Sequence, residues 1–263
     1  MPETPHPAPV PYGEFVDWDK RLDREGPFFR HLFEERGVRR VVDMGAGSAR
    51  HAIMFATWGL EVIAVDPGES MLAEARQNLE RFGGDIAVAA GRVELLEGGF
   101  GDLAGLRVRD ADALVCTGNA LPHVAGVEGL RTALADFAGA LRPGGLLVLH
   151  LLNHDRLLAR RERAIMPKVR DTDGGGVRVF MRLIGYAEDD SVLDFDFVTL
   201  TRDAAGSWDL SSRRSEHTVI TLDTLRAALR GAGFVGVEFF GDHNGRPLDV
   251  DGDESVIVVA RLG

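Results

Sequence analysis

Residues 41–50 read Val-Val-Asp-Met-Gly-Ala-Gly-Ser-Ala-Arg, and they join a run of β-branched residues to a segment with helical periodicity. Gly45 and Gly47 let the backbone turn sharply after a strand and let a ligand approach the main chain. The next apolar run, residues 61–66, ends in an acid, Asp66. This strand–turn–helix–strand order predicts a parallel βαβ unit that binds a ligand at the carboxyl ends of its strands.

Outward from this unit, short apolar strands alternate with helical segments. Such alternation is typical of an α/β protein with a doubly wound, mostly parallel sheet. We predict seven strands, at residues 38–44, 61–66, 86–90, 113–116, 146–151, 235–240 and 255–261. The predicted helices span residues 14–36, broken at Gly26-Pro27, then 48–58 with Ser48 as cap, 70–82 ended by Gly83-Gly84, 127–141 and 222–231.

Residues 177–219 follow a different pattern, in which apolar and polar side chains alternate between turns. This pattern predicts three antiparallel strands, at 177–186, 192–201 and 208–219. We therefore divide the chain into an N-terminal arm and helices (1–37), a ligand-binding α/β domain (38–154 and 217–263), and an antiparallel β insertion (155–216) that we interpret as a substrate lid. The first eleven residues are rich in proline and are expected to form a loosely packed arm.

The charge and composition exclude several classes of partner. The chain has 263 residues and a net charge of −11, because 41 acidic residues outnumber 30 basic ones. Since such a charge repels polyphosphates and anionic surfaces, we expect no nucleic-acid and no membrane partner. Cys116 is the only cysteine, which excludes an internal disulfide or a cysteine-cluster metal site. The N-terminus does not resemble a signal peptide, so we expect a cytoplasmic protein.

The chemistry of the glycine turn narrows the ligand to a nucleoside. An acid that ends the second strand can accept hydrogen bonds from ribose hydroxyls, so Asp66 indicates an adenosine-containing cofactor. A dinucleotide site carries a third glycine where this chain has Arg50, and that glycine serves close packing beside a pyrophosphate. S-adenosylmethionine, which has no phosphate, is therefore favoured over NAD. An NAD-linked oxidoreductase and a catalytically silent cofactor-binding protein remain the alternatives.

Several segments together resemble the class I S-adenosylmethionine-dependent methyltransferases, and among them the glycine/sarcosine N-methyltransferase-like group. These segments are Val-Asp-Met-Gly-Ala-Gly (42–47), Val-Asp (65–66), Cys-Thr-Gly-Asn-Ala-Leu-Pro-His (116–123), Leu-Arg-Pro-Gly-Gly (141–145), Asn-His-Asp (153–155) and Gly-Asp-His-Asn-Gly-Arg-Pro-Leu (241–248). The resemblance implies a Rossmann-like methyltransferase fold. It also implies transfer of a methyl group to a small-molecule acceptor, nitrogen favoured over oxygen, by in-line displacement at the sulfonium methyl.

The same resemblance assigns roles to individual residues. It places Asn119 and His123 at the reaction centre as the candidate catalytic residues. Arg21 would pair with the cofactor carboxylate, with Arg24 as the substitute if the register differs. The residues expected to line the amino-acid, ribose and methionine parts of the cofactor are Asp43, Gly45, Ala46, Gly47, Asp66 and Thr117.

Two positions depart from the pattern of that group. Leu152 stands where glycine N-methyltransferase-like enzymes carry an arginine for the substrate carboxylate, just before Asn153. Because a leucine cannot neutralise a carboxylate, glycine and sarcosine are disfavoured as substrates. In the loop of the third strand, where the group usually offers an acid and an apolar residue to adenine, this chain reads Ala-Gly-Arg-Val (90–93), and we place the adenine contacts at Gly91 and Arg92.

The histidines and acids complete the prediction. His123, His150 and His154 follow strands that end at the same edge, and a neutral imidazole could accept a proton near pH 7. His123 is the one we favour as pocket-lining, and the others are expected to be structural. The acids have no metal-ligand spacing, so we predict no metal. The sequence leaves open the acceptor, the general base and whether the chain forms a homo-oligomer.

Overall fold

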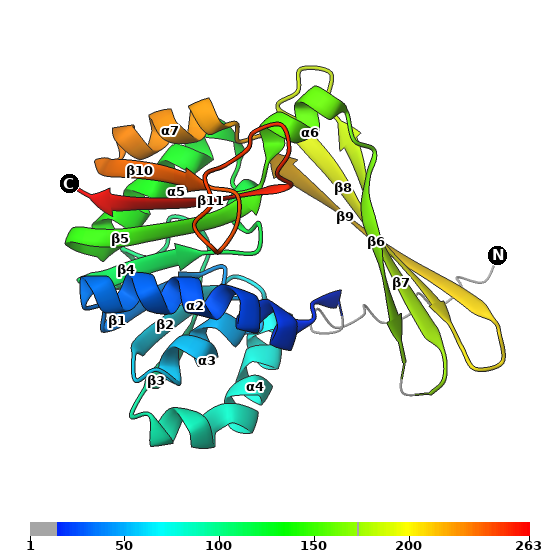
Figure 1. The fold of residues 1–263 in the computed structure, drawn as a ribbon, viewed down its shortest axis with the longest axis horizontal. Coiled ribbons are helices and arrows are strands. Elements are labelled where there is room, and N and C mark those ends of the chain that lie inside the picture. The colour runs from blue at the N-terminus through cyan, green and yellow to red at the C-terminus, as the bar shows by residue number, and fades with distance from the viewer. Residues whose placement is uncertain (1–14, 173) are drawn as a thin grey trace. The chain divides into compact units, whose positions relative to one another are not determined.

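The computed structural model describes residues 15–172 and 174–263, which form two units (Figure 1). The larger unit comprises Trp18–Arg156 and Ile220–Gly263, and the smaller comprises residues 15–17 and Leu157–Val219. The predicted arm over residues 1–11 lies outside the described residues. Residues 18–37 belong to the larger unit instead of forming a separate N-terminal region, because Phe29 and Phe33 are buried in its core.

The larger unit is built on a seven-stranded sheet. Strand β11 runs antiparallel to both of its neighbours, whereas the pairs from β5 to β3 are all parallel. The chain fills one side of β1 with β2 and β3 before it crosses to β4, so the strand order reverses beside β1. Across the sheet the strands are β10 (Phe234–Phe240), β11 (Ser255–Leu262), β5 (Leu141–Leu152), β4 (Ala111–Cys116), β1 (Arg40–Met44), β2 (Glu61–Asp66) and β3 (Arg92–Glu97).

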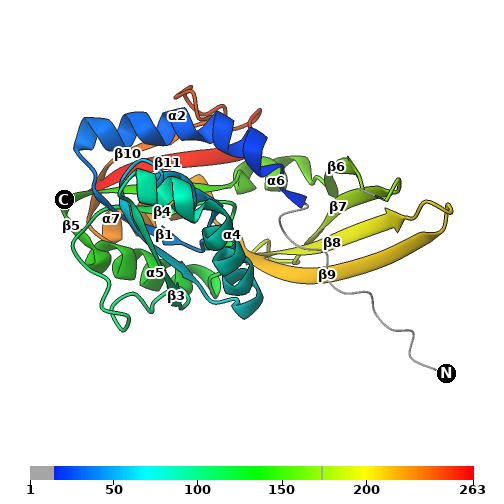
Figure 2. The ribbon, with the colours of Figure 1, turned by 90° about the horizontal axis from the view of Figure 1, so that it is seen from below.

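Helices cover both faces of this sheet, because successive side chains of a strand point to opposite faces and those of β1 from Val41 to Met44 are all buried. Val41 packs against α2, α3 and α4, whereas its neighbour Val42 packs against α5 and α7. Figure 2 shows α2 and α5 on opposite sides of the sheet. The helices are α2 (Trp18–Arg36), α3 (Arg50–Ala56), α4 (Glu69–Val88), the short 3-10 helix η1 (Leu121–His123), α5 (Gly126–Ala140), α6 (His154–Arg160) and α7 (Leu222–Gly231).

Two predicted helix boundaries were wrong because tertiary packing overrides local breakers. Helix α2 continues through Pro27, and Gly26 lets it approach α3, since a Cβ there would lie 3.4 Å from Met54 Sδ. Helix α4 continues through Gly83-Gly84 to Val88, so the third strand is β3 and not residues 86–90. The start of α3 also differs, because Ala49 and not Ser48 is its N-cap residue.

The smaller unit is an antiparallel sheet of four strands, one more than predicted. The strand that was not predicted is β6. Its buried and exposed residues do not alternate regularly, and its exposed residues include the apolar Met166 and Val169. The inner face of the sheet buries Phe180, Ile184 and Phe195. The strands lie in the order β6 (Ala164–Asp171), β7 (Val177–Tyr186), β8 (Val192–Arg202) and β9 (Trp208–Thr218).

Among the described residues, no helix combines the length and the apolar character that crossing a bilayer requires.

Candidate functional site

The turn after β1 is held by backbone groups and by Asp66 at the end of β2. The amides of Gly45 and Ala46 donate to the carbonyl of Val65, at 2.8 and 3.0 Å. The amide of Gly47 donates to Asp66 Oδ2 at 2.8 Å, and the amide of Gly68 donates to Asp66 Oδ1 at 2.8 Å. Each carboxylate oxygen retains a further lone pair, so Asp66 can fix the turn and still accept a hydrogen bond from a ligand.

Glycine is required at position 45 for two independent reasons. Its φ of +73° lies in the left-handed region, and a Cβ there would lie 2.7 Å from the Cβ of Ala120. Ala120 belongs to the loop after β4, so the loops after β1 and β4 meet where the strand order reverses. Ligands of doubly wound sheets bind at this point.

Asp43 is buried at the base of this turn, with only 1% of its surface exposed. Burial raises the pKa of its carboxyl to about 7, and the nearby charge of Asp66 acts in the same direction. The backbone amide of Ala52 and the charge of Arg21 act against that shift. Asp43 Oδ2 has no hydrogen-bond partner among the described residues. A cationic group bound here would stabilise the ionised carboxylate.

Arg21 and Glu25, one turn apart on α2, form a buried ion pair. Arg21 Nε donates to Glu25 Oε1 at 2.9 Å, and the guanidinium lies over the ring of Trp18. Arg21 Nη2 is buried and has no partner within the described part of the chain. The guanidinium therefore keeps one donor that a carboxylate ligand could use. Arg24 reaches the same Glu25 oxygen at 3.3 Å, but its side chain is 67% exposed, so Arg21 is the better candidate.

A chain of three polar side chains runs from Glu25 to the end of β4. Glu25 Oε2 and His51 Nε2 are 2.8 Å apart, and His51 Nδ1 and Thr117 Oγ1 are 3.4 Å apart. Burial would raise the pKa of Glu25, but the His51 hydrogen bond and the charge of Arg21 hold this pKa well below its usual range. Burial also lowers the pKa of His51. A neutral His51 would donate from Nε2 to Glu25 and accept at Nδ1 from the hydroxyl of Thr117.

Asn119 has a structural role that the sequence did not suggest. Its side-chain Oδ1 accepts the amide of Leu152 at 2.8 Å, and its own amide donates to the carbonyl of His150 at 3.1 Å. Its φ is +66°, a conformation that asparagine tolerates better than most residues. These bonds tie the loop after β4 to the end of β5. We therefore assign Asn119 to the support of this loop, and its expected catalytic role stays a prediction.

The histidines after the strands behave differently from one another. His123 ends the 3-10 helix η1 and its side chain is exposed. His154 is fully buried and its Nδ1 accepts the amide of Ile220 at 2.8 Å, while burial lowers its pKa to about 4. Asp155 accepts the amide of Leu222, at the start of α7. His154 and Asp155 thus anchor the returning chain.

Gly91 and Arg92 lie at the amino end of β3, whereas Asp66 lies at the carboxyl end of the neighbouring strand β2. The prediction that they contact the cofactor was therefore wrong. Arg92 begins β3 and is paired with Glu61, the first residue of β2. The error follows from the misplaced third strand. Its carboxyl end is Glu97, which is paired with Asp66. Arg50, which stands at the third glycine position of a dinucleotide motif, packs against other side chains. Its guanidinium lies over the Phe82 ring, 4.6 Å from the centroid, and pairs with Asp19 at 3.3 Å.

Glu25 and His51 are the residues that sequence analysis missed. A signal for Glu25 was present, since it lies seven residues after Trp18 and four before Phe29 and so shares the apolar face of α2. A carboxylate on such a face needs a partner. His51 gave no comparable signal, because its partners come from α2 and from the loop after β4.

These features together define a class of protein. The reversal of strand order beside β1, the glycine turn and the acid after β2 make a candidate nucleoside site, and Asp43 Oδ2 and Arg21 Nη2, which have no partner among the described residues, suit the ammonium and carboxylate of an amino-acid tail. S-adenosylmethionine contains both parts. The fold is that of the class I S-adenosylmethionine-dependent methyltransferases.

Comparisons with known proteins identify the domain. Residues 41–145 match the family described as "Methyltransferase domain". The glycine/sarcosine N-methyltransferase of Parasynechococcus marenigrum is 34% identical over 151 residues, 56% of this chain and 50% of that protein. The chain thus spans about half the length of the curated relatives it matches.

Two solved structures agree with the fold. An amino pentose methyltransferase from Micromonospora echinaspora has a TM-score of 0.72 at 23% identity and covers 95% of this chain and 94% of its own. A sugar N-methyltransferase from a Streptoalloteichus species has a TM-score of 0.67 at 20% identity, with 94% and 89% covered. At these identities the likeness shows the fold alone. The predicted fold class is thereby confirmed, and the match over residues 41–145 agrees with the predicted methyltransferase domain.

Proposed function

We propose that the protein is an S-adenosylmethionine-dependent methyltransferase that methylates the nitrogen of a small-molecule amine. The observation that carries the proposal is the pair of unsatisfied buried atoms, Asp43 Oδ2 and Arg21 Nη2, near the turn that Asp66 holds. The two side chains are close enough for the guanidinium charge to act on the pKa of Asp43. A ligand with an ammonium and a carboxylate group would satisfy both.

Most of the residues that would hold the cofactor lie at the carboxyl ends of β1, β2 and β4, and Arg21 comes from α2. Asp66 would accept the ribose hydroxyls, Asp43 and Arg21 would bind the amino-acid tail, and Thr117 would face the methionine portion. Gly45, Ala46 and Gly47 would leave room for a close approach to the backbone. When bound, S-adenosylmethionine supplies an electrophilic methyl group that the lone pair of the acceptor displaces in line. The contribution of the chain is to align the acceptor and to exclude water.

The proposed acceptor is an amine without a carboxylate next to it. The names of the relatives support nitrogen, since they include a glycine/sarcosine N-methyltransferase and a sugar N-methyltransferase. Half-buried Leu152 cannot form an ion pair with a substrate carboxylate. This difference from the glycine-methylating group supports an amine acceptor that has no neighbouring carboxylate.

The cofactor site is tested by replacing Asp66 with alanine. Asp66→Ala removes the acceptor of two amides and the proposed ribose contact, so calorimetry should show affinity for S-adenosylhomocysteine that is weaker by on the order of 100-fold. The matched control is Asp112→Ala. Asp112 also accepts two backbone amides, those of Arg39 and Arg40 at 2.8 and 2.9 Å, but at the amino end of β1. Equal loss of affinity in both variants would contradict the proposed site.

The acceptor is tested with a panel of amines that includes amino sugars, glycine and sarcosine, with methylated product detected by mass spectrometry. We expect product from an amine without a carboxylate and none from glycine. Product from glycine at a comparable rate would contradict the argument from Leu152. Cofactor binding without product from any amine would instead support a catalytically silent cofactor-binding protein.

His123 is the residue that we propose accepts the proton of the acceptor ammonium. A positively charged amine has no lone pair to react, and imidazole is suited to removing its proton near neutral pH. His123→Ala should lower kcat by on the order of 100-fold and remove the acidic limb of its pH profile. His31→Ala, which alters an exposed histidine of α2, is the control. An unchanged rate and profile in His123→Ala would exclude this role.

A further inference from the structure

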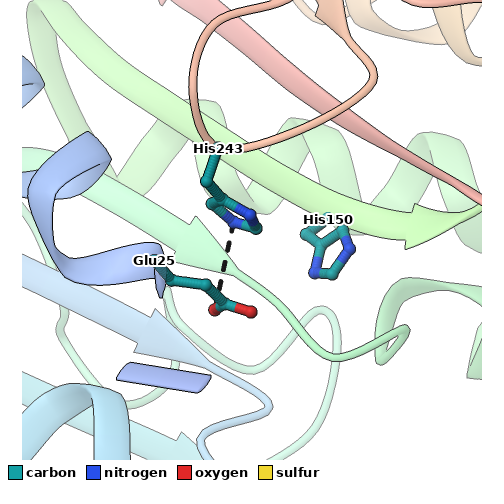
Figure 3. A group of neighbouring side chains, drawn as sticks. All are labelled: Glu25, His150 and His243. Atoms are coloured by element: carbon teal, nitrogen blue, oxygen red, sulfur yellow. Dashed lines mark ion pairs between the residues drawn. The ribbon is translucent and has the colours of Figure 1, made fainter. Parts of the chain in front are cut away.

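Glu25 of the α2 ion pair lies close to two histidines from distant parts of the sequence. Glu25 comes from α2, His150 from β5, and His243 from the segment after β10 (Figure 3). One ligand atom of each residue lies within 4.8 Å of the other two, and His243 Nε2 is 3.9 Å from Glu25 Oε2. The rings of His150 and His243 meet edge to face, with centroids 5.3 Å apart.

Two imidazole nitrogens in this cluster are unsatisfied. His150 Nδ1 and His243 Nε2 are buried and have no hydrogen-bond partner among the described residues. A buried polar atom without a partner calls for an unseen water or ion. Neutral imidazole is the form that binds metal ions.

The two oxygens of Glu25 face different groups. Oε1 accepts from Arg21 and Arg24, whereas Oε2 faces His51 and His243. Since a carboxylate oxygen has two lone pairs, Oε2 can accept from His51 and keep one lone pair for an ion. His51 would then orient the carboxylate ligand from outside, as hydrogen-bonded neighbours of metal ligands commonly do.

Two aromatic rings of α2 lie beside His243 in this cluster. The rings of Phe28 and Phe29 lie 5.5 and 6.1 Å from that of His243, measured between centroids. Glu25 and His243 are both buried.

We propose that Glu25, His150 and His243 form a binding site for a divalent transition-metal ion, of which Zn²⁺ is the expected occupant. Histidine nitrogen and carboxylate oxygen bind Zn²⁺ at about 2.0–2.2 Å, so atoms within 4.8 Å of one another need to move inward by roughly 0.7 Å or less. Two nitrogen donors favour a transition metal over Mg²⁺ and Ca²⁺, which prefer oxygen. Water would complete the coordination.

This proposal departs from the sequence-based prediction of no metal. That prediction considered spacing along the chain, whereas these ligands are separated by more than a hundred and by about ninety residues. The proposal does not depend on the proposed methyl transfer. Metal binding and cofactor binding can each fail without the other.

The test uses the full chain, purified without a histidine tag and dialysed against a chelator. Titration with Co²⁺ should give one equivalent of binding with a visible absorption spectrum, and Zn²⁺ should displace it. Zn²⁺ should also raise the unfolding temperature. X-ray absorption of the Zn²⁺-loaded wild-type protein should show two imidazole ligands. Absence of stoichiometric binding, or a metal environment without histidine, would overturn the proposal.

Variants assign the site to the three residues. His243→Asn, His150→Asn and Glu25→Gln should each weaken Co²⁺ binding by on the order of 100-fold or more. His31→Asn should leave binding unchanged, because His31 is an exposed histidine of α2. Circular dichroism without metal confirms that each variant is folded, and the wild-type absorption measurement stands if one is not. Full binding in all three folded variants would place the ion elsewhere and overturn the assignment.

Discussion

Asp43 and Glu25 are two buried carboxyl groups in the same unit, and their environments shift their pKa values in opposite directions. Asp43 is 1% exposed and Glu25 is not exposed at all. Burial raises the pKa of Asp43 to about 7, and the charge of Arg21 opposes this shift only in part. Burial acts on Glu25 too, but the hydrogen bond of His51 and the charge of Arg21 hold its pKa far below the usual range.

The difference shows that burial alone does not decide the charge of a carboxyl group. Glu25 belongs to a network whose partners are already present in the chain. Asp43 lies at the end of β1 with one oxygen unsatisfied among the described residues. We interpret Glu25 as part of the folded framework and Asp43 as a group that becomes satisfied when a cationic ligand binds.

Among the variants that test this comparison, Glu25→Gln should lower the free energy of unfolding most. Removing one partner of a buried ion pair costs about 3–5 kcal/mol, because Arg21 is left buried without its counter-charge. The control is Glu128→Gln, which removes an exposed i,i+3 ion pair with Arg131 and should cost at most about 1 kcal/mol. Urea unfolding measures both. Equal small losses would mean that Glu25 is not part of the framework.

The wild-type contribution of Glu25 should also depend on pH. A lowered pKa in the folded state gives stability that is present above the unfolded pKa and is lost as pH falls. The free energy difference between wild type and Glu25→Gln should therefore shrink below about pH 4.5. A constant difference down to pH 3 would contradict the assigned direction.

A smaller loss should follow from Gly45→Ala, which tests whether the turn near Asp43 is held by geometry. The left-handed φ of +73° and a Cβ 2.7 Å from Ala120 together should cost about 2–4 kcal/mol. Gly37→Ala is matched in φ, at +61°, but meets no atom within 4 Å and should cost only about 1 kcal/mol. Adding Ala120→Gly to Gly45→Ala should recover part of the loss. If the two glycine variants cost the same, the contact with Ala120 contributes nothing.

Asp43→Asn should change the free energy of unfolding least near pH 4. As the pH rises, the variant should become more stable than wild type. A raised folded pKa gives stability that is present below the unfolded value of 3.8 and is lost as pH rises toward about 7. Asp43→Asn should therefore gain stability relative to wild type between about pH 4 and pH 7. The affinity of wild type for S-adenosylmethionine should rise with pH over the same range, and that of the variant should not. Parallel profiles would remove Asp43 from the cofactor site.

The sequence predicted the elements whose signals are local. The glycine turn, Asp66 and helix α7 were placed within a residue or two, because strand periodicity and turn chemistry act over a few neighbouring positions. Local signals failed where packing outweighed them, as at Pro27 inside α2 and at Gly83-Gly84 inside α4. The second failure displaced the third strand and with it the predicted contacts of Gly91 and Arg92.

By itself the sequence determined the fold class, and it predicted the cofactor and the end of the sheet where the candidate site lies, since each of these predictions follows from a contiguous segment with its own chemistry. Only the tertiary structure decided that Glu25, His51, His150 and His243 meet, that Asn119 supports a loop, and that Asp43 and Glu25 titrate in opposite directions. Electrostatic energy depends on distances through space and on exclusion of water, and neither is written in the spacing of residues along a chain.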